Sequence, residues 1–261
     1  MRRISQIVLV VASLGAVPVD AATACHAAST ALARPLIELY TSEGCDSCPP
    51  ADHWLASRFD AASAKPQAVA LAFHVDYWDR LGWVDRFAKA EYTQRQQAAM
   101  RANHATFVFT PQILLQGHDF AAWRSADATP VDRIAQARAG AALVVDVEPR
   151  ERDVVVHADA RIADGVQAPD AALFIAYADS GLVSQVKAGE NRGRQLRHDH
   201  VVRALQRVAP APRDGHIDAT LTLPRPVERG THPEIVAFVQ REQGGDVLQA
   251  LALPLDGCTS H

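Results

Sequence analysis

The stretch ELYTSEGCDSCPPAD, residues 38–52, runs from a short apolar strand pattern into two cysteines three positions apart and then into two prolines. A Cys-x-x-Cys pair at a strand-to-helix junction puts Cys45 at the helix N-terminus, where the positive end of the helix dipole favours the thiolate. Cys48 lies one turn further on, where it can attack a mixed disulfide. Pro49 and Pro50 are tolerated only in the first helical turn, so they fix where the helix begins. We therefore expect a reactive Cys45 that a partner protein can reach.

Three interpretations of this cysteine pair stay open: a redox pair, a metal site and a permanent structural disulfide. Zinc needs four ligands, and the sequence has no second Cys-x-x-Cys and no His-x-x-x-His. Copper is held by fewer soft ligands, so Cys45 and Cys48 with His74 or His104 form an alternative copper site. The redox interpretation is the main hypothesis, and no metal ligand is assigned.

Composition and the first residues bound the class of protein. The chain has 261 residues, is 48% hydrophobic and carries a formal charge of −4, which gives no general reason to expect nucleic acid as a partner. Arg2 and Arg3 precede an apolar run over residues 7–17 that is too short to cross a bilayer. This pattern predicts a signal peptide over residues 1–21, cleaved after Ala21, and a periplasmic or secreted protein without a membrane span.

Export changes how the four cysteines are interpreted, because thiols outside the cytosol are not held reduced by glutathione. The even count predicts two disulfides, Cys25 with Cys258 and Cys45 with Cys48. The first would close a loop of over two hundred residues and stabilise the fold by roughly 4 to 5 kcal/mol. The alternative is lipidation of Cys25, but the residues before it lack the usual large aliphatic side chain.

The pattern of apolar residues divides the chain near residue 142. Short apolar strands alternate with helical stretches over residues 34–142, which predicts an α/β domain with a sheet and crossover helices. Residues 143–256 carry period-two runs separated by turns, which predicts an antiparallel β-sandwich domain. In the first domain we expect strands over 35–42, 67–78 and 107–117, and helices over 49–59, 85–103 and 129–142.

A proline interrupts the last of these predicted strands. VFTPQILLQG, residues 108–117, places Pro111 at the start of the strand, where a proline needs a structural reason. We expect a cis bond between Thr110 and Pro111 beside the two cysteines, as in thioredoxin-like folds. Thr110 would then turn its backbone toward a bound extended peptide and position the substrate.

Several motifs of the chain resemble those of a known family. ELYTSEGCDSCPPAD, LAFHVDYWDRLGWVD and TPQILLQG are similar to motifs of the secreted, thioredoxin-like proteins grouped as domain of unknown function 1223, and GENRGRQLRHDHVVRAL resembles the segment that recurs in their second half. The resemblance covers about residues 35–255. It implies a thioredoxin-like fold for the first half, with Cys45 and Cys48 on the redox loop and Pro111 as the cis-proline, and it implies no demonstrated reaction.

One departure from ordinary thioredoxins concerns the two residues between the cysteines. Asp46 and Ser47 stand where ordinary thioredoxins have Gly-Pro. A carboxylate beside Cys45 disfavours its thiolate, which argues against a strongly oxidising potential.

Two further groups of polar residues are candidates for supporting roles. His74 and Asp76 follow the second predicted strand and are candidate proton acceptors for the Cys48 thiol. Near them, Trp78 and Trp83 are expected to pack against the sheet rather than to form a ligand groove.

The segment NRGRQLRHDHVVRALQR, residues 191–207, is rich in arginine and is expected to be a solvated face or an interdomain contact. Its pair His198 and His200 lacks a third ligand for a metal.

These observations combine into one hypothesis. The protein is an exported thiol-disulfide oxidoreductase that needs no cofactor and acts on exported proteins carrying thiols or disulfides. Cys45 would attack, Cys48 would resolve, and Thr110 with Pro111 would position the substrate. The alternatives are a copper- or peptide-binding module of thioredoxin-like fold and a structural adaptor with a permanent disulfide. The sequence leaves the oligomeric state open.

Overall fold

The computed structural model describes residues 25–60, 68–125, 127–210, 214–243 and 245–258. The predicted signal peptide, residues 1–21, lies outside the described residues. Among these residues the α-helices are α1 (Pro49–Arg58), α2 (Ala90–Ala102) and α3 (Thr129–Ala135), and the short 3-10 helices are η1 (Asp76–Leu81) and η2 (Ala121–Arg124). The strands are β1 (Cys25–Ala28), β2 (Leu36–Thr41), β3 (Val69–His74), β4 (Gln112–Leu115), β5 (His118–Asp119), β6 (Ala141–Pro149), β7 (Asp153–Ile162), β8 (Ala171–Asp179), β9 (Leu182–Gln185), β10 (Gln195–His198), β11 (Val201–Pro210), β12 (His216–Pro224), β13 (Glu234–Arg241) and β14 (Val247–Pro254).

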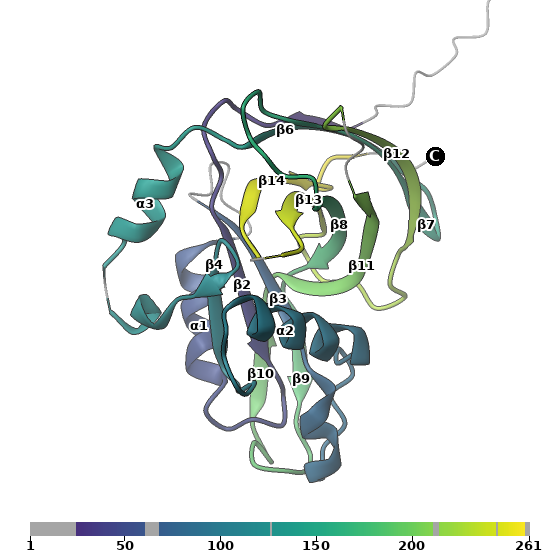
Figure 1. Ribbon diagram of the computed structural model, residues 1–261. Helices are drawn as coiled ribbons and strands as arrows, with labels where there is room; N and C mark the ends of the chain where they lie inside the picture. The colour runs from purple at the N-terminus through teal and green to yellow at the C-terminus, as the bar shows by residue number, and fades with distance from the viewer. Residues whose placement is uncertain (1–24, 61–67, 126, 211–213, 244, 259–261) are drawn as a thin grey trace, which may run out of the picture.

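An eight-stranded sheet forms the centre of the molecule, with the strand order β14-β13-β8-β11-β3-β2-β4-β5 (Figure 1). A four-stranded sheet, β1-β6-β7-β12, arches over one part of it, and β9 and β10 form a separate two-stranded hairpin at the opposite end of the molecule. The protein therefore has a mixed α/β fold dominated by sheets.

The part of the central sheet formed by the first half of the chain is covered on both faces. β2 and β3 are parallel, and β4 runs antiparallel to β2. Alternate residues of β2 enter two different cores: Leu36 and Tyr40 pack on the α2 side, whereas Ile37 and Leu39 pack on the side of α1 and α3. This two-sided burial leaves every residue of β2 buried, and its polar Glu38 is paired with Arg95.

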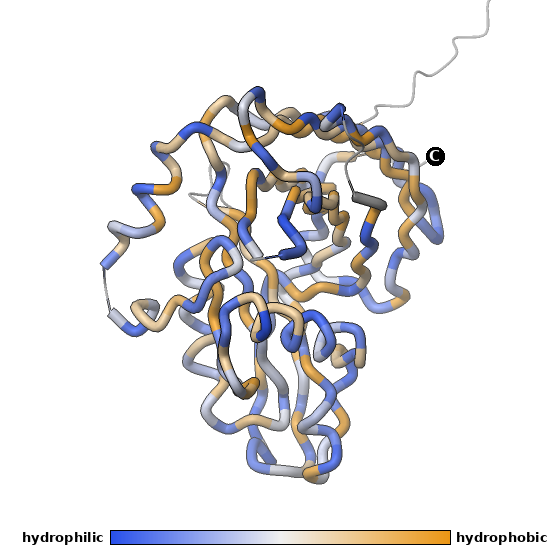
Figure 2. Tube along the Cα trace, in the orientation of Figure 1, coloured by the Kyte–Doolittle hydropathy of each residue, from blue (hydrophilic) through white to orange (hydrophobic). Residues whose placement is uncertain are grey.

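The second half of the chain extends the same sheet. β11 joins β3 in parallel at the pair Val201 and Ala72, and β8 and β13 follow as antiparallel neighbours. The four-stranded sheet covers the other face of these strands, and hydrophobic and hydrophilic residues alternate along β6, β7 and β12 (Figure 2). The predicted domain boundary near residue 142 falls in β6. Because the eight-stranded sheet contains strands from before and after this boundary, the division into two domains stays a prediction.

Two of the predicted helices are shorter than expected. α2 begins at residue 90 instead of 85, because Asp85 accepts the backbone N–H groups of Glu43 and Phe87 and holds this segment in a turn. α3 covers only residues 129–135 of the predicted 129–142. No helix among the described residues has the length and apolar character needed to span a membrane.

The two ends of the described chain are joined covalently. Cys25, in β1, and Cys258 form the disulfide that the sequence predicts, across a separation of 233 residues. This pairing makes Cys25 a structural cysteine, and β1 adds further support by pairing antiparallel to β6.

Arg95 of α2 connects strands from both halves of the chain. Its guanidinium lies 5.3, 5.2 and 5.1 Å from the ring centroids of Phe73, Phe174 and Phe238. It also donates a 2.5 Å hydrogen bond to Glu38, whose side chain is only 1% exposed. A buried ion pair of this kind fixes the position of α2 over the sheet, because either charge alone would be costly to bury.

We predict that Arg95→Ala lowers the free energy of unfolding by about 3 to 5 kcal/mol, since it leaves the buried Glu38 carboxylate without a charged partner, with only the Tyr40 hydroxyl still donating to it. The matched control is Arg207→Ala, which breaks an ion pair with Glu242 at the surface and should cost about 1 kcal/mol or less. Urea unfolding of both variants measures the difference. Equal losses would show that Arg95 does not stabilise the sheet in this way.

Candidate functional site at the Cys45–Cys48 disulfide

Cys45 and Cys48 form a disulfide in the turn between β2 and α1, with their Cα atoms 5.4 Å apart. Cys48 caps α1, and the two prolines occupy its first two positions, as the sequence predicts. The prolines have no N–H to donate, and the next two amides, of Ala51 and Asp52, both donate to the Cys48 carbonyl oxygen. The start of α1 therefore offers no free amide to stabilise a Cys45 thiolate.

A hydroxyl group supplies a polar contact for Cys45 instead. Ser47 Oγ lies 3.4 Å from Cys45 Sγ, within hydrogen-bond distance for sulfur. When the disulfide is reduced, this hydroxyl is in position to donate to a thiolate on Cys45. Ser47 thus offsets part of the unfavourable charge of its neighbour Asp46.

Both sulfur-bearing side chains are fully buried. Cys45 and Cys48 are each 0% exposed, so the expectation that a partner reaches Cys45 directly is wrong for this conformation. The loop between β9 and β10, residues 186–194, contacts the backbone around Cys45. Asn191 Nδ2 donates to the carbonyl oxygens of Glu43 and Cys45, at 2.9 and 2.8 Å, and Asn191 itself is 0% exposed.

The Thr110–Pro111 bond lies at the same end of the sheet. The bond is cis, as the sequence predicts, and the next residue, Gln112, pairs with Tyr40 near the end of β2. Trp78 connects this segment with the cysteine loop: its Nε1 donates to Thr110 Oγ1 at 2.8 Å. Trp78 also lies close to the backbone of the cysteine loop, because a Cβ atom added to Gly44 would be only 3.2 Å from Trp78 Cβ.

A buried histidine and carboxylate lie beneath the cysteine loop. His74 Nδ1 lies 2.7 Å from Asp85 Oδ2, and both side chains are 0% exposed. Burial alone would lower the pKa of His74, but the charge of Asp85 and its hydrogen bond raise that pKa above its ordinary value. Burial alone would raise the pKa of Asp85, but His74 and two backbone N–H groups lower it.

The sequence named His74 and Asp76 as candidate proton acceptors, and the structure places His74, but not Asp76, in the buried cluster. Asp76 is turned to α2, where it accepts a 2.5 Å hydrogen bond from Thr93 Oγ1. Asp85 takes its place beside His74. Both aspartates follow β3 within a dozen residues, so spacing alone did not distinguish them, and the signal lies in the turn that Asp85 itself forms.

Glu43 and His198 complete this polar cluster, and sequence reasoning missed the role of both. Glu43 is 0% exposed and its Oε2 accepts a 2.7 Å hydrogen bond from Trp83 Nε1. His198 of β10 brings Nε2 to 3.4 Å from Glu43 Oε1, and its ring meets that of His74 edge to face at 4.9 Å. Burial alone would raise the pKa of Glu43, but His198 and the Trp83 N–H lower it.

Asp52, an ionisable residue near the cysteines, lines a cavity. Its Oδ2 accepts a 3.2 Å hydrogen bond from Thr41 Oγ1, and burial raises the pKa of its carboxyl group. The cavity, of about 550 Å³, lies between α1 and β10, and Pro49 and His53 line it next to Asp52. Asp52 thus stands between solvent and the buried cluster.

Residues 36–240 match the family described as "Protein of unknown function (DUF1223)". The chain belongs to this family. The resemblance seen in the sequence motifs is therefore confirmed.

Two solved structures are similar to this DUF1223 protein. One is a crystal structure of a protein from Agrobacterium tumefaciens, solved by a structural genomics consortium, with 27% identity and a TM-score of 0.59 over 86% of this chain and 96% of that one. The other is HBP35 of Porphyromonas gingivalis, with 13% identity and a TM-score of 0.62 over 88% and 78% of the two chains, a likeness of fold alone. No curated protein sequence matches the chain.

The arginine-rich segment of this DUF1223 protein contacts the cysteine loop through the side chain of Asn191. The sequence predicted a solvated face or an interdomain contact for this segment. Arg194 donates to Asn191 Oδ1 within its own loop, and Arg197 pairs with Asp199. His200 lies apart from His198, since its ring bonds the carbonyl oxygen of Phe59 and lies 3.2 Å from Glu234. The two histidines therefore form no metal pair.

The histidines of the copper alternative also lie apart. His104 follows α2, and its neighbour Asn103 bonds Gly117 beyond the far end of β4, away from the cysteines. His74 is engaged by Asp85. This arrangement does not fit a copper site made of the cysteines with His104.

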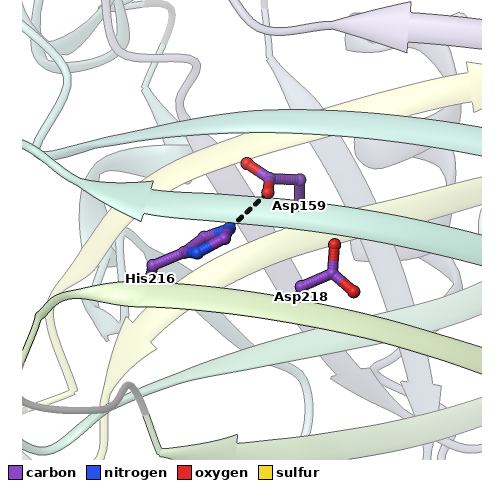
Figure 3. A group of neighbouring side chains, drawn as sticks. All are labelled: Asp159, His216 and Asp218. Atoms are coloured by element: carbon purple, nitrogen blue, oxygen red, sulfur yellow. Dashed lines mark hydrogen bonds and ion pairs between the residues drawn. The ribbon is translucent and has the colours of Figure 1, made fainter.

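One other group of titratable side chains lies on the four-stranded sheet. Asp159 of β7 and His216 and Asp218 of β12 bring ligand-type atoms within 4.8 Å of one another (Figure 3). His216 contacts the Asp159 carboxylate, and Arg161 Nε lies 3.6 Å from it. Two basic side chains thus balance the two carboxylates, and the group is a surface charge network remote from the cysteines.

We predict that Asp85→Asn reduces stability most between about pH 4 and 6.5. The pKa of His74 is raised, so its contribution is complete below the ordinary value of 6.5 and is lost as pH rises through the folded value. The pKa of Asp85 is lowered, so its contribution is complete above 3.8 and is lost as pH falls through the folded value.

Urea unfolding of the wild type and of Asp85→Asn at pH 5.5 and at pH 9 measures this effect. The control is Asp76→Asn, whose carboxylate contacts Thr93 rather than a histidine. The same loss of stability at both pH values for Asp85→Asn would contradict an ion pair between His74 and Asp85.

Proposed function

We propose that this protein exchanges thiols and disulfides with other exported proteins through Cys45 and Cys48. The observation that carries the proposal is the disulfide of a Cys-x-x-Cys pair directly before α1, at the sheet end that Thr110 and Pro111 share. A polar hydroxyl beside Cys45 and a buried set of ionisable groups beneath it supply the chemistry that exchange needs.

We further propose that the first half of the chain is thioredoxin-like. Support comes from the strand order β3-β2-β4-β5, with β2 and β3 parallel and joined through α1. α1 and α3 cover one face of these strands, and α2 covers the other. In this arrangement the cysteine loop follows the first strand of the unit.

The exchange runs in two steps that balance in atoms and electrons. A thiolate of a partner dithiol attacks Cys45 Sγ, the Cys45–Cys48 bond breaks, and Cys48 leaves as a thiolate that takes a proton. The second partner thiolate then attacks the partner sulfur bonded to Cys45, which releases reduced Cys45. Two electrons pass to the protein, and the partner leaves as a disulfide. The reverse sequence, in which Cys45 attacks and Cys48 resolves, reduces a partner disulfide.

The proton for Cys48 comes from the inner side of the loop in this proposal. Asp52 donates its backbone N–H to the Cys48 carbonyl, and its carboxyl group has a raised pKa, so it holds a proton at higher pH than an exposed aspartate does. His74, which the sequence named with Asp76 as a candidate proton acceptor for the Cys48 thiol, belongs to the buried cluster beneath the same loop. Both residues are positioning or proton-handling groups rather than nucleophiles.

The test is turnover of a protein disulfide, with insulin reduction and the repair of scrambled ribonuclease as substrates. Wild-type protein should accelerate both reactions, and Cys45→Ser should abolish the acceleration because it removes the attacking sulfur. Cys25→Ala with Cys258→Ala is the matched control, since it removes the other disulfide and should keep activity at a temperature where the variant is folded. Wild-type rates equal to those of Cys45→Ser with Cys48→Ser would overturn the proposal.

The burial of both cysteines favours a second candidate, a permanent structural disulfide that supports the turn before α1. The two candidates differ in how the disulfide responds to a mild reductant under native conditions. A disulfide that stays intact until the protein unfolds supports the structural role, whereas reduction in the folded state supports exchange.

We also propose a periplasmic or secreted location. The support is the signal peptide predicted over residues 1–21 and the two disulfides, which persist outside the cytosol. Cell fractionation that leaves the protein in the cytosol would contradict this location.

A further inference from the structure

We infer that the β9–β10 hairpin is a lid over the Cys45–Cys48 disulfide, held closed by Asn191 and able to open without disturbing the central sheet. The inference rests on the proposed exchange function for its purpose, but its structural basis is separate. It explains how a disulfide that is fully buried in this conformation becomes available to a partner.

The hairpin is a unit of its own. β9 and β10 pair with each other in a register from Leu182 with His198 to Gln185 with Gln195, and they belong to neither of the larger sheets. The hairpin projects from the end of the molecule where β2 and β3 end (Figure 1). Moving it therefore breaks no hydrogen bond of the eight-stranded ladder.

Both connections of the hairpin to the core have unusual backbone conformations. Gly181 precedes β9 with a φ of 76°, and His200 follows β10 with a φ of 58°. Few residues adopt such angles, so these two positions mark where the chain changes direction between the lid and β8 or β11. A rotation of the hairpin would be absorbed at Gly181 and on the β10 side of His200, whose buried ring stays bonded to the Phe59 carbonyl oxygen.

Three residues attach the hairpin to the cysteine loop. Asn191 donates to the carbonyl oxygens of Glu43 and Cys45, and the Glu190 carboxylate accepts the Asp46 N–H at 3.2 Å. His198 provides the contact nearer the base, at 3.4 Å from Glu43. The two bonds of Asn191 bracket Gly44 directly before the disulfide, so this side chain is the principal fastening of the lid.

The interface beneath the hairpin is poorly satisfied. His198 Nδ1 and His74 Nε2 are buried and make no hydrogen bond to a described residue, and the 3.4 Å contact between His198 Nε2 and Glu43 Oε1 does not have the geometry of a hydrogen bond. Buried polar atoms without partners raise the free energy of the closed state, and opening would let water bind them. Packing of Leu182 against Phe87 and the hydrogen bond from Arg86 to the Val183 carbonyl oxygen offset part of this cost at the base of the hairpin. The unpaired polar atoms lower the net stability of the closed state, which suits an element that opens.

The test measures access to the disulfide with dithiothreitol as a small dithiol probe. Folded protein is exposed to a pulse of reductant, quenched and alkylated, and peptide mass spectrometry follows reduction of Cys45–Cys48. We expect Asn191→Ala to speed reduction about tenfold, because it removes two hydrogen bonds of the closed state. Glu190→Ala, a milder change at an exposed residue, should act in the same direction with a smaller effect.

The matched control is Arg192→Ala, in the same loop, whose exposed side chain makes no contact with the cysteine loop and should leave the rate unchanged. Urea unfolding of each variant verifies that it is folded. Equal rates for wild type, Asn191→Ala and Glu190→Ala would overturn the lid. Faster reduction of Asn191→Ala together with no turnover of protein substrates would support the lid and remove the exchange function, so the two proposals fail separately.

Discussion

The parallel contact between β11 and β3 is the constraint on which the rest of this structure depends. It consists of the pair Val201 and Ala72, together with the hydrogen bond from the Ala72 N–H to the His200 carbonyl. Through it the second half of the chain continues the sheet of the first half. The β9–β10 hairpin, which immediately precedes this contact, is thereby carried to the end of the sheet where the cysteine loop lies. Burial of the disulfide follows from topology rather than from the cysteine motif.

His200 strengthens this junction from its other side. Its ring bonds the Phe59 carbonyl oxygen after α1 and lies 3.2 Å from Glu234 of β13, so it links elements on both sides of the contact. Arg95 acts similarly across the opposite face, where it contacts rings from β3, β8 and β13. The main sheet is therefore fastened on both faces, whereas the hairpin is attached by the polar contacts of Asn191 and Glu190 at its tip and by packing of Leu182 against Phe87 at its base. This contrast in attachment is what allows one element to move while the site behind it keeps its geometry.

The polar cluster beneath the disulfide joins residues that lie far apart in the sequence. Glu43 belongs to the cysteine loop, and His198 comes from the hairpin. His74 is the last residue of β3, and Asp85 lies in the segment that follows it. A charge change at one of them is felt by the others, because burial weakens the screening between them. The cluster thus couples the protonation of the site to the position of the hairpin.

Local sequence rules predicted much of the first half of this protein. The double proline fixed the start of α1, the even cysteine count gave both disulfides, and Thr110–Pro111 was correctly expected to be cis. Each of these features depends on residues within a few positions or on a simple count.

The burial of Cys45 and the role of Asn191 could not be predicted in this way. They depend on a contact between residues 146 positions apart, and no periodicity reports such a contact. That Asp85 rather than Asp76 lies beside His74 has a related cause. The turn after β3 decides which of the two carboxylates faces inward. The mixed α/β class was accessible because it follows from patterns along the chain, whereas access to the site depends on tertiary contacts.

The central claim is that Cys45 is a reactive sulfur despite its cover, and trapping a mixed disulfide tests it most directly. In Cys48→Ser the resolving thiol is missing, so a covalent adduct between Cys45 and an unfolded protein carrying disulfides should accumulate. Mass spectrometry should locate this adduct at Cys45. If no adduct forms while a small alkylating reagent still labels Cys45 in the folded variant, the sulfur is accessible but does not exchange with proteins, and the account is wrong.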